Sequence, residues 1–216
     1  MTSPSPPAAI LLLGAFFLPA AAPAEGGAPP WIGVGVAAGA VAPDPHLADY
    51  RWDAGTRPFL GAEALAGWRA LSGGLRVSTW ETSQSLGGAA PDPGVRLTGV
   101  ELVGRLRLLA LGGFSLHGLG SAGRVTVAYR PDRAVIELPG GEPLPVAFDR
   151  EEEWIAGLGL AAEHRLPGPL AVGAGIERST FALDTAHREG NAVVRERESF
   201  HTWSLKLRLF WKLRTL

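Results

Sequence analysis

The segment from Phe200 to Leu213, Phe-His-Thr-Trp-Ser-Leu-Lys-Leu-Arg-Leu-Phe-Trp-Lys-Leu, alternates between two kinds of side chain. From Trp203 onward every second residue is a tryptophan or a leucine. The positions between them hold Ser204, Lys206, Arg208, Phe210 and Lys212. Because successive side chains of a β-strand point to opposite faces, this segment is predicted to be a strand with one oily and one mostly polar face.

The same period of two recurs earlier in the chain. Seven further strands are predicted at residues 31–41, 59–71, 75–84, 95–108, 114–129, 152–166 and 170–182. Two of them are irregular, since Trp80 falls on a polar face and Val125 and Val127 fall on the phase opposite to Phe114. A bulge near Gly118–Gly123 is predicted to shift that phase. With the last segment, the strands number eight.

The predicted connections alternate in length. Residues 72–74, 111–113 and 167–169 are short, whereas 42–58, 85–94, 130–150 and 185–198 are long and mostly polar. This segregation predicts an all-β fold, an eight-stranded antiparallel up-and-down transmembrane β-barrel with short periplasmic turns and long extracellular loops. At the start of the longest loop, 130–150, the segments Val125–Tyr129 and Ala134–Leu138, joined by Pro131-Asp-Arg133, are candidates for a hairpin above the membrane. The alternative is a soluble periplasmic barrel of the lipocalin kind, with its oily face turned inward around a hydrophobic ligand.

The first residues are typical of a targeting segment rather than of part of the folded protein. An apolar run from Ala8 to Ala22 is broken by Pro19 and followed by the small-x-small site Ala22-Pro-Ala24. Residues 1–24 are therefore predicted to be a secretory signal peptide, 25–30 a short lead and 31–216 the barrel.

Composition excludes several classes of function. The net charge is −1 and cysteine is absent, which argues against a nucleic-acid binder, disulfide scaffolds, thiol catalysis and cysteine-ligated zinc. The sequence contains no nucleotide, metal or cofactor signature, so neither a cofactor nor a metal is expected.

Aromatic residues gather at both ends of the predicted strands. Tryptophan and phenylalanine favour the two membrane–water interfaces of a barrel. The residues predicted at these interfaces are Trp31, Trp68, Phe114 and Trp211 at the turn end, and Trp154 and Trp203 at the loop end.

The inward faces carry charges of both signs. An eight-stranded barrel is just wide enough for its interior side chains to fill it, and buried charges must be paired. Glu177 and Lys206 are predicted to meet, with Arg208 as the other candidate partner. The interior is then a plug of ion pairs or, because glycines leave room for water, a narrow channel. The predicted ion-pair network comprises Glu63, Arg69, Arg76, Glu101, Arg105, Glu163, Glu177, Lys206 and Arg208.

One pair of residues invites a catalytic hypothesis. Ser199 and His201 lie two apart on the lipid-facing phase, where a lipid acyl hydrolase needs a nucleophile and a base, with Glu198 or Glu177 as the acid. The order of serine and histidine is the reverse of that in the lipid A deacylase barrels, and both acids fall on the opposite phase. The pattern favours interfacial polar residues, and no catalytic residue is predicted.

Residues 31–216 together resemble the small eight-stranded outer-membrane barrels, the class of the OmpA transmembrane domain, OmpX and the OmpW-like proteins. The resemblance rests on the signal peptide, the strand count, the loop asymmetry and the last strand. The chain ends in Lys212-Leu-Arg-Thr-Leu216, whereas many members end on an aromatic residue.

The resemblance implies a place in the outer membrane of a Gram-negative-type bacterium and insertion by the barrel-assembly machinery. It also implies contact with outer-membrane lipid and lipopolysaccharide. The implied role is non-enzymatic, either structural or a surface interaction with an unidentified extracellular partner through the loops. The alternatives are a narrow solute channel, an outer-leaflet acyl hydrolase or the soluble lipocalin-like binder.

Overall fold

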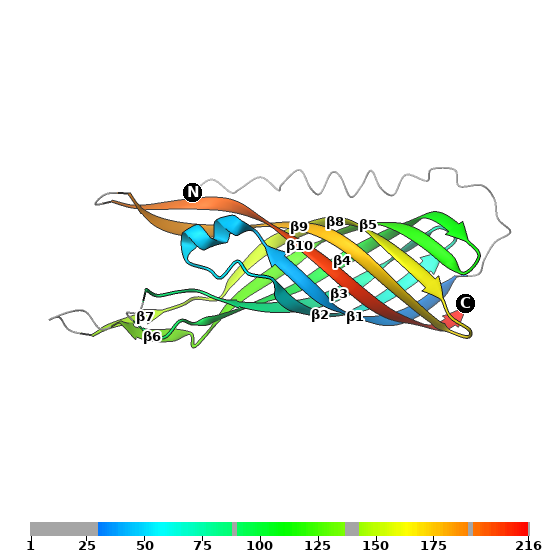
Figure 1. Ribbon diagram of the computed structural model, residues 1–216, viewed down its shortest axis with the longest axis horizontal. Helices are drawn as coiled ribbons and strands as arrows, with labels where there is room; N and C mark the ends of the chain where they lie inside the picture. The colour runs from blue at the N-terminus through cyan, green and yellow to red at the C-terminus, as the bar shows by residue number, and fades with distance from the viewer. Residues whose placement is uncertain (1–29, 88–89, 137–142, 190–191, 216) are drawn as a thin grey trace.

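The computed structural model describes residues 30–87, 90–136, 143–189 and 192–215. These residues form ten strands and one short 3₁₀ helix (Figure 1). In chain order the elements are β1 (Trp31–Pro43), η1 (Pro45–Tyr50), β2 (Arg57–Trp68), β3 (Leu71–Ser83), β4 (Gly94–Leu111), β5 (Phe114–Arg130), β6 (Arg133–Ile136), β7 (Leu144–Ala147), β8 (Glu151–Arg165), β9 (Leu170–Glu189) and β10 (Ala192–Thr215). Among the described residues, no helix has the length and apolar character needed to cross a membrane.

Eight of these strands close into a barrel, which confirms the predicted fold class. The order around the barrel is β1-β10-β9-β8-β5-β4-β3-β2, and every neighbouring pair is antiparallel. Following the paired residues once around the barrel leads from Gly33 back to Pro43, a shear of ten residues. A shear of this size requires the strands to tilt strongly against the barrel axis, as Figure 1 shows.

The three tight turns lie at one end of the barrel, together with the C-terminus (Figure 1). The turn between β2 and β3 consists of Arg69 and Ala70, and Arg69 adopts a left-handed conformation with φ of 55°. The predicted turn at residues 72–74 is wrong, because these residues already belong to β3. The predicted turn near Gly112 is confirmed, and that glycine supplies the positive φ, 58°, that the reversal requires.

Two hairpins project beyond the barrel at its other end (Figure 1). Strands β6 and β7 pair with each other in a separate sheet, and the pairing of β9 with β10 continues past Phe181, where pairing with β8 stops. The predicted hairpin of Val125–Tyr129 with Ala134–Leu138 is therefore wrong in its partner. Residues 125–129 belong to the barrel strand β5, and Leu138 lies outside the described residues.

The predicted bulge in the fifth barrel strand is wrong as well. Strand β5 pairs continuously with β8, and the register shifts instead between Arg107 and Leu109 in β4. Because β5 stays regular, Val125 and Val127 point into the barrel, where both are buried.

The outer face of the barrel is apolar on every strand. On β10 the exposed residues are the predicted oily ones, from Trp203 to Leu213, and Leu207 between them is 66% exposed. Large apolar side chains are also exposed on the other strands; on β5 the exposed one is Phe114, and Gly118, Gly120 and Ala122 share its outward phase. A continuous apolar belt around a closed barrel needs lipid as its solvent, so the chain is a transmembrane barrel.

Candidate functional site

A cluster of four charges crosses the middle of the lumen. Arg76 of β3 donates to both carboxylate oxygens of Glu177 of β9, with N–O distances of 2.5 and 2.6 Å, and to Glu101 of β4 at 2.8 Å. Lys206 Nζ of β10 lies 2.8 Å from the same Glu177 carboxylate. Ser121 of β5 also donates to that carboxylate, at 2.9 Å. Strands β3, β5 and β10 thus contact the Glu177 carboxylate of β9. Strand β4 joins this cluster because its Glu101 binds Arg76.

This cluster is deeply buried and formally neutral, with two cations and two carboxylates. Glu177 is 1% exposed and Lys206 6% exposed. Charges removed from water at this depth persist only when each is paired and hydrogen-bonded. The structure brings together Glu177 and Lys206, as the sequence predicts, and adds Arg76 from across the barrel as the main partner of Glu177.

The space that glycine leaves in the lumen is occupied by side chains. A Cβ atom placed on Gly157 lies 2.5 Å from a Glu177 carboxylate oxygen and 2.7 Å from the Ser121 hydroxyl. A Cβ on Gly33 or Gly35 meets the Phe210 ring at 2.7 or 2.8 Å. These three glycines therefore make room for large groups from other strands.

Two further ion pairs lie in the same interior. Arg208 pairs with Glu63, not with Glu177, and Arg105 donates to Glu163 at 2.8 Å. Eight of the nine charged residues predicted in the lumen therefore meet an opposite charge there: Glu63, Arg76, Glu101, Arg105, Glu163, Glu177, Lys206 and Arg208.

The ninth predicted lumen residue, Arg69, lies elsewhere. It occupies the β2–β3 turn, is exposed, and places its guanidinium carbon 4.3 Å from the ring centroid of Trp68. Strand β2 ends at Trp68, short of the predicted end at residue 71, so the strand phase does not extend to Arg69.

An apolar layer lies in the lumen toward the loop end. Phe181, Phe200 and Leu97 belong to it, and Leu47 and Trp52 join it from the β1–β2 loop. Trp80 packs against this layer, which explains why that residue falls on an inward face. The buried members are Leu47, Trp52, Val95, Leu97, Val125, Val127, Phe181, Leu183 and Phe200.

Asp44 anchors the β1–β2 loop over this layer. Its carboxylate accepts the backbone N–H groups of His46 at 3.1 Å and of His201 at 3.0 Å, and it pairs with the His46 ring at 2.9 Å. Burial raises the pKa of Asp44, but these hydrogen bonds outweigh it and hold the pKa below its usual value. The bond to Asp44 raises the pKa of His46. The loop is thereby tied to β10.

A second apolar layer lies in the lumen at the turn end. Phe210 and Leu65 are its largest buried members, and Trp31 packs edge-on against Phe210 with ring centroids 5.5 Å apart. Trp31 is thus wrongly predicted as a membrane-interface residue, because it shares the inward phase of Gly33 and Gly35. Aromatic side chains thus face inward at both ends of the lumen, and in the sequence the inward phases of Phe181 and Phe210 are the signal for these two layers.

The other predicted interface aromatics face outward. Trp68, Phe114 and Trp211 are exposed near the turn end, and Trp154 and Trp203 are exposed toward the loop end. They border the apolar belt on both sides, as membrane-interface residues do.

The hypothetical hydrolase site is not assembled. His201 Nδ1 lies 2.9 Å from the Thr180 hydroxyl, and no hydrogen bond among the described residues joins it to Ser199. Glu177 is held in the lumen by Arg76 and Lys206, out of reach of the outer face. Among the described residues no group of three or more potential ligands is placed to hold a metal ion.

Comparisons with known proteins add a fold likeness. No family model and no curated protein matches the chain. Among solved structures, Neisserial surface protein A has a TM-score of 0.48 at 14% identity, covering 88% of this chain and 100% of that one. Ail, the attachment invasion locus protein of Yersinia pestis, has a TM-score of 0.40 at 15% identity, covering 84% and 97%. A major outer membrane protein from Thermus thermophilus has 0.43 at 13%, covering 84% and 99%.

Proposed function

We propose that the chain is a closed, non-conducting outer-membrane barrel that acts at the cell surface through the structures at its loop end. The filled lumen is the observation that carries this proposal. An apolar layer lies at each end of the lumen, and the Arg76–Glu177 charge cluster lies between them. Because a filled lumen offers no path for a solute, we assign the function to the parts of the chain that lie outside the membrane.

The parts available for a surface interaction are the two projecting hairpins. Val135 of β6 and Leu144 of β7 are exposed apolar residues on a two-stranded sheet with free edges. A free strand edge offers unpaired backbone groups to an extended partner segment. The β9–β10 ribbon is braced to the barrel by Arg197, which pairs with Glu153 of β8 and with Asp184 at 3.1 Å.

Conductance measurement tests the closed lumen. The purified barrel, refolded and inserted in a planar lipid bilayer, is expected to show no stepwise current. The variant Phe210→Gly removes the largest buried side chain of the turn-end layer and serves as the matched probe of whether that layer contributes to the seal. Regular single-channel steps from the unsubstituted barrel would contradict the proposal and favour the channel alternative.

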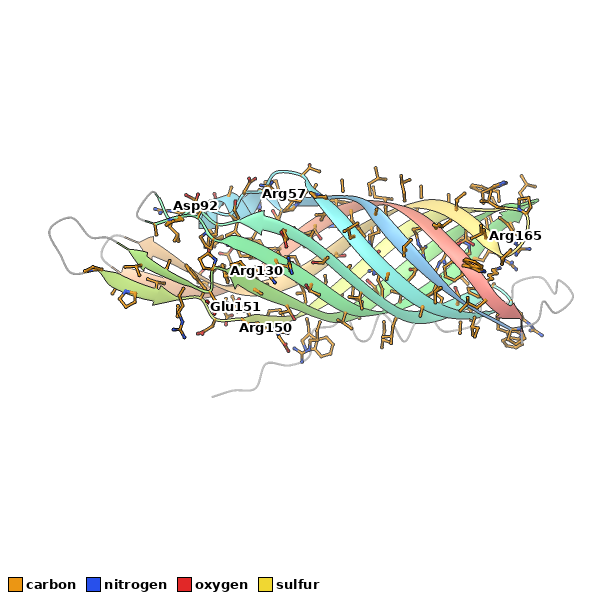
Figure 2. All side chains as sticks on the ribbon, turned by 90° about the horizontal axis from the view of Figure 1, so that it is seen from below. Arg57, Asp92, Arg130, Arg150, Glu151 and Arg165 are labelled. Atoms are coloured by element: carbon orange, nitrogen blue, oxygen red, sulfur yellow. The ribbon has the colours of Figure 1, made fainter. Side chains whose placement is uncertain are left out.

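Protease digestion of intact cells tests the orientation. Arg150 and Arg130 lie at one end of the barrel and Arg165 at the other (Figure 2). Trypsin is expected to cut after Arg150, an exposed residue in the coil before β8, and the variant Arg150→Gln is expected to lose that cut. The turn end should be protected by the membrane, so cleavage after Arg165 in intact cells would invert the proposed topology.

A further inference from the structure

Two arginines face outward near the loop end of the apolar belt. Arg124 of β5 and Arg178 of β9 are both exposed. Their chain neighbours Val125 and Glu177 are buried in the lumen, and alternation along the strand then turns both arginines toward the membrane.

Each of these arginines lies over a tryptophan of the adjacent strand. The guanidinium carbon of Arg124 is 4.1 Å from the ring centroid of its cross-strand partner Trp154. That of Arg178 is 5.9 Å from the ring centroid of its partner Trp203. A guanidinium held over a ring face keeps its in-plane N–H groups available for a planar, bidentate contact with an oxyanion.

The charges of these two arginines are not neutralised within the described part of the chain. Three other arginines at this end are paired: Arg96 with Glu81, Arg150 with Glu152 at 3.1 Å, and Arg197 with Glu153. Among the described residues, no carboxylate forms an ion pair with Arg124 or Arg178. Two exposed cations bordering an apolar belt are complementary to anions at the lipid surface.

Apolar side chains continue directly from the arginines toward the turn end. Leu158 of β8 is the cross-strand partner of Arg178, and Leu160 pairs with Ile176 of β9. All three are about half exposed on the outer face. A phosphate held by an arginine would therefore have its acyl chain lying on these side chains.

We propose that Arg124 and Arg178, with Trp154 and Trp203, bind phosphate groups of lipids in the membrane leaflet at the loop end. The inference rests on the membrane orientation of the proposed function. The arginines lie two strands apart, about 10 Å across the sheet, and are offset by four residues in register, about 13 Å along it. The strand tilt brings them to a similar depth. The expected ligand is a lipid whose headgroup carries phosphates at the outer surface.

Lipid competition at the barrel surface tests the proposal. The barrel is reconstituted in vesicles of brominated phosphatidylcholine, which quenches tryptophan fluorescence, and lipid A is added as the competing lipid. Lipid A is expected to relieve the quenching of wild-type protein. The variant Arg124→Gln/Arg178→Gln should bind it roughly tenfold more weakly for each arginine removed, because each loses a charge-assisted hydrogen bond.

The matched controls separate phosphate recognition from other effects. Arg96→Gln, whose arginine is paired internally with Glu81, should bind lipid A like the wild type. Lipid A stripped of its phosphates should bind wild-type protein as weakly as lipid A binds the double variant. Inorganic phosphate should not compete, because a free anion lacks the acyl chains.

An equal affinity of wild type and double variant for lipid A would overturn the proposal, and so would unchanged binding after removal of the phosphates. The assay does not depend on whether the barrel conducts. Stepwise current in a planar bilayer would therefore refute the closed lumen while leaving this result intact, so the two failures are distinguishable.

Discussion

Replacing Glu177 by glutamine is expected to lower the free energy of unfolding of the barrel by about 3–5 kcal/mol, the usual effect of breaking a buried ion pair by removing one partner. The carboxylate is 1% exposed and receives Arg76, Lys206 and Ser121. Without its charge, Arg76 keeps Glu101, but Lys206 is left buried with no anion of its own. The loss is measured by urea unfolding of the barrel in phospholipid vesicles.

A second substitution identifies the cause of that loss. Lys206→Met in the Glu177→Gln background restores neutrality, leaving Arg76 paired with Glu101 at 2.8 Å. The double variant is expected to be more stable than Glu177→Gln alone, with a coupling of about 0.5–3 kcal/mol between the two sites.

A matched control variant is Glu163→Gln. Its carboxylate also pairs with an arginine, Arg105, but it is 18% exposed, and water can replace part of the lost contact. A smaller loss is expected there. Equal losses at Glu177 and Glu163, or simple additivity of Glu177→Gln and Lys206→Met, would show that the central cluster is hydrated rather than sealed.

Much of the barrel follows from local pattern, because the period of two and the lengths of the connections are properties of neighbouring residues. They predict which strands exist, how they connect, and that Leu205 or Leu207 faces lipid while Lys206 does not. The pairing of Glu177 with Lys206 can be predicted in the same way, because β9 and β10 are consecutive in the chain and neighbours in the barrel.

The contact of Arg76 with Glu177, in contrast, cannot be predicted from the local sequence pattern. Strands β3 and β9 are not neighbours in the barrel, and their side chains meet only across the lumen. Which residues face one another there depends on the shear, and a single bulge in β4 changes it. Alternation along one strand carries no information about that alignment.

The misassigned aromatic and valine phases have a common physical cause. A mostly polar lumen is the expectation that places Val125, Val127 and Trp31 on the lipid side, and all three have the inward phase instead. The interior is instead layered, with apolar side chains at both ends and charges between them. In such an interior an inward residue can be apolar, and hydrophobicity alone does not distinguish lumen from lipid.

Arginine in place of Leu207 is expected to destabilise the barrel by about 2–4 kcal/mol, the cost of a charge at the bilayer midplane. Leu207 lies midway between the two outward tryptophans of β10, four residues from Trp203 and four from Trp211, and is 66% exposed to the membrane. Arginine at this depth has the longest path to either interface.

Ser199→Arg is the matched control for this substitution. Ser199 shares the outward phase of Leu207 and lies four residues beyond Trp203 toward the loop end, where it is exposed. The cost there should be about 0–1 kcal/mol. Ser204 is unsuitable as an inward control, because it is buried with its hydroxyl 3.3 Å from the Glu177 carbonyl oxygen, and arginine does not fit there. Unfolding in vesicles measures both variants, and equal stabilities would mean that Leu207 does not face the bilayer core.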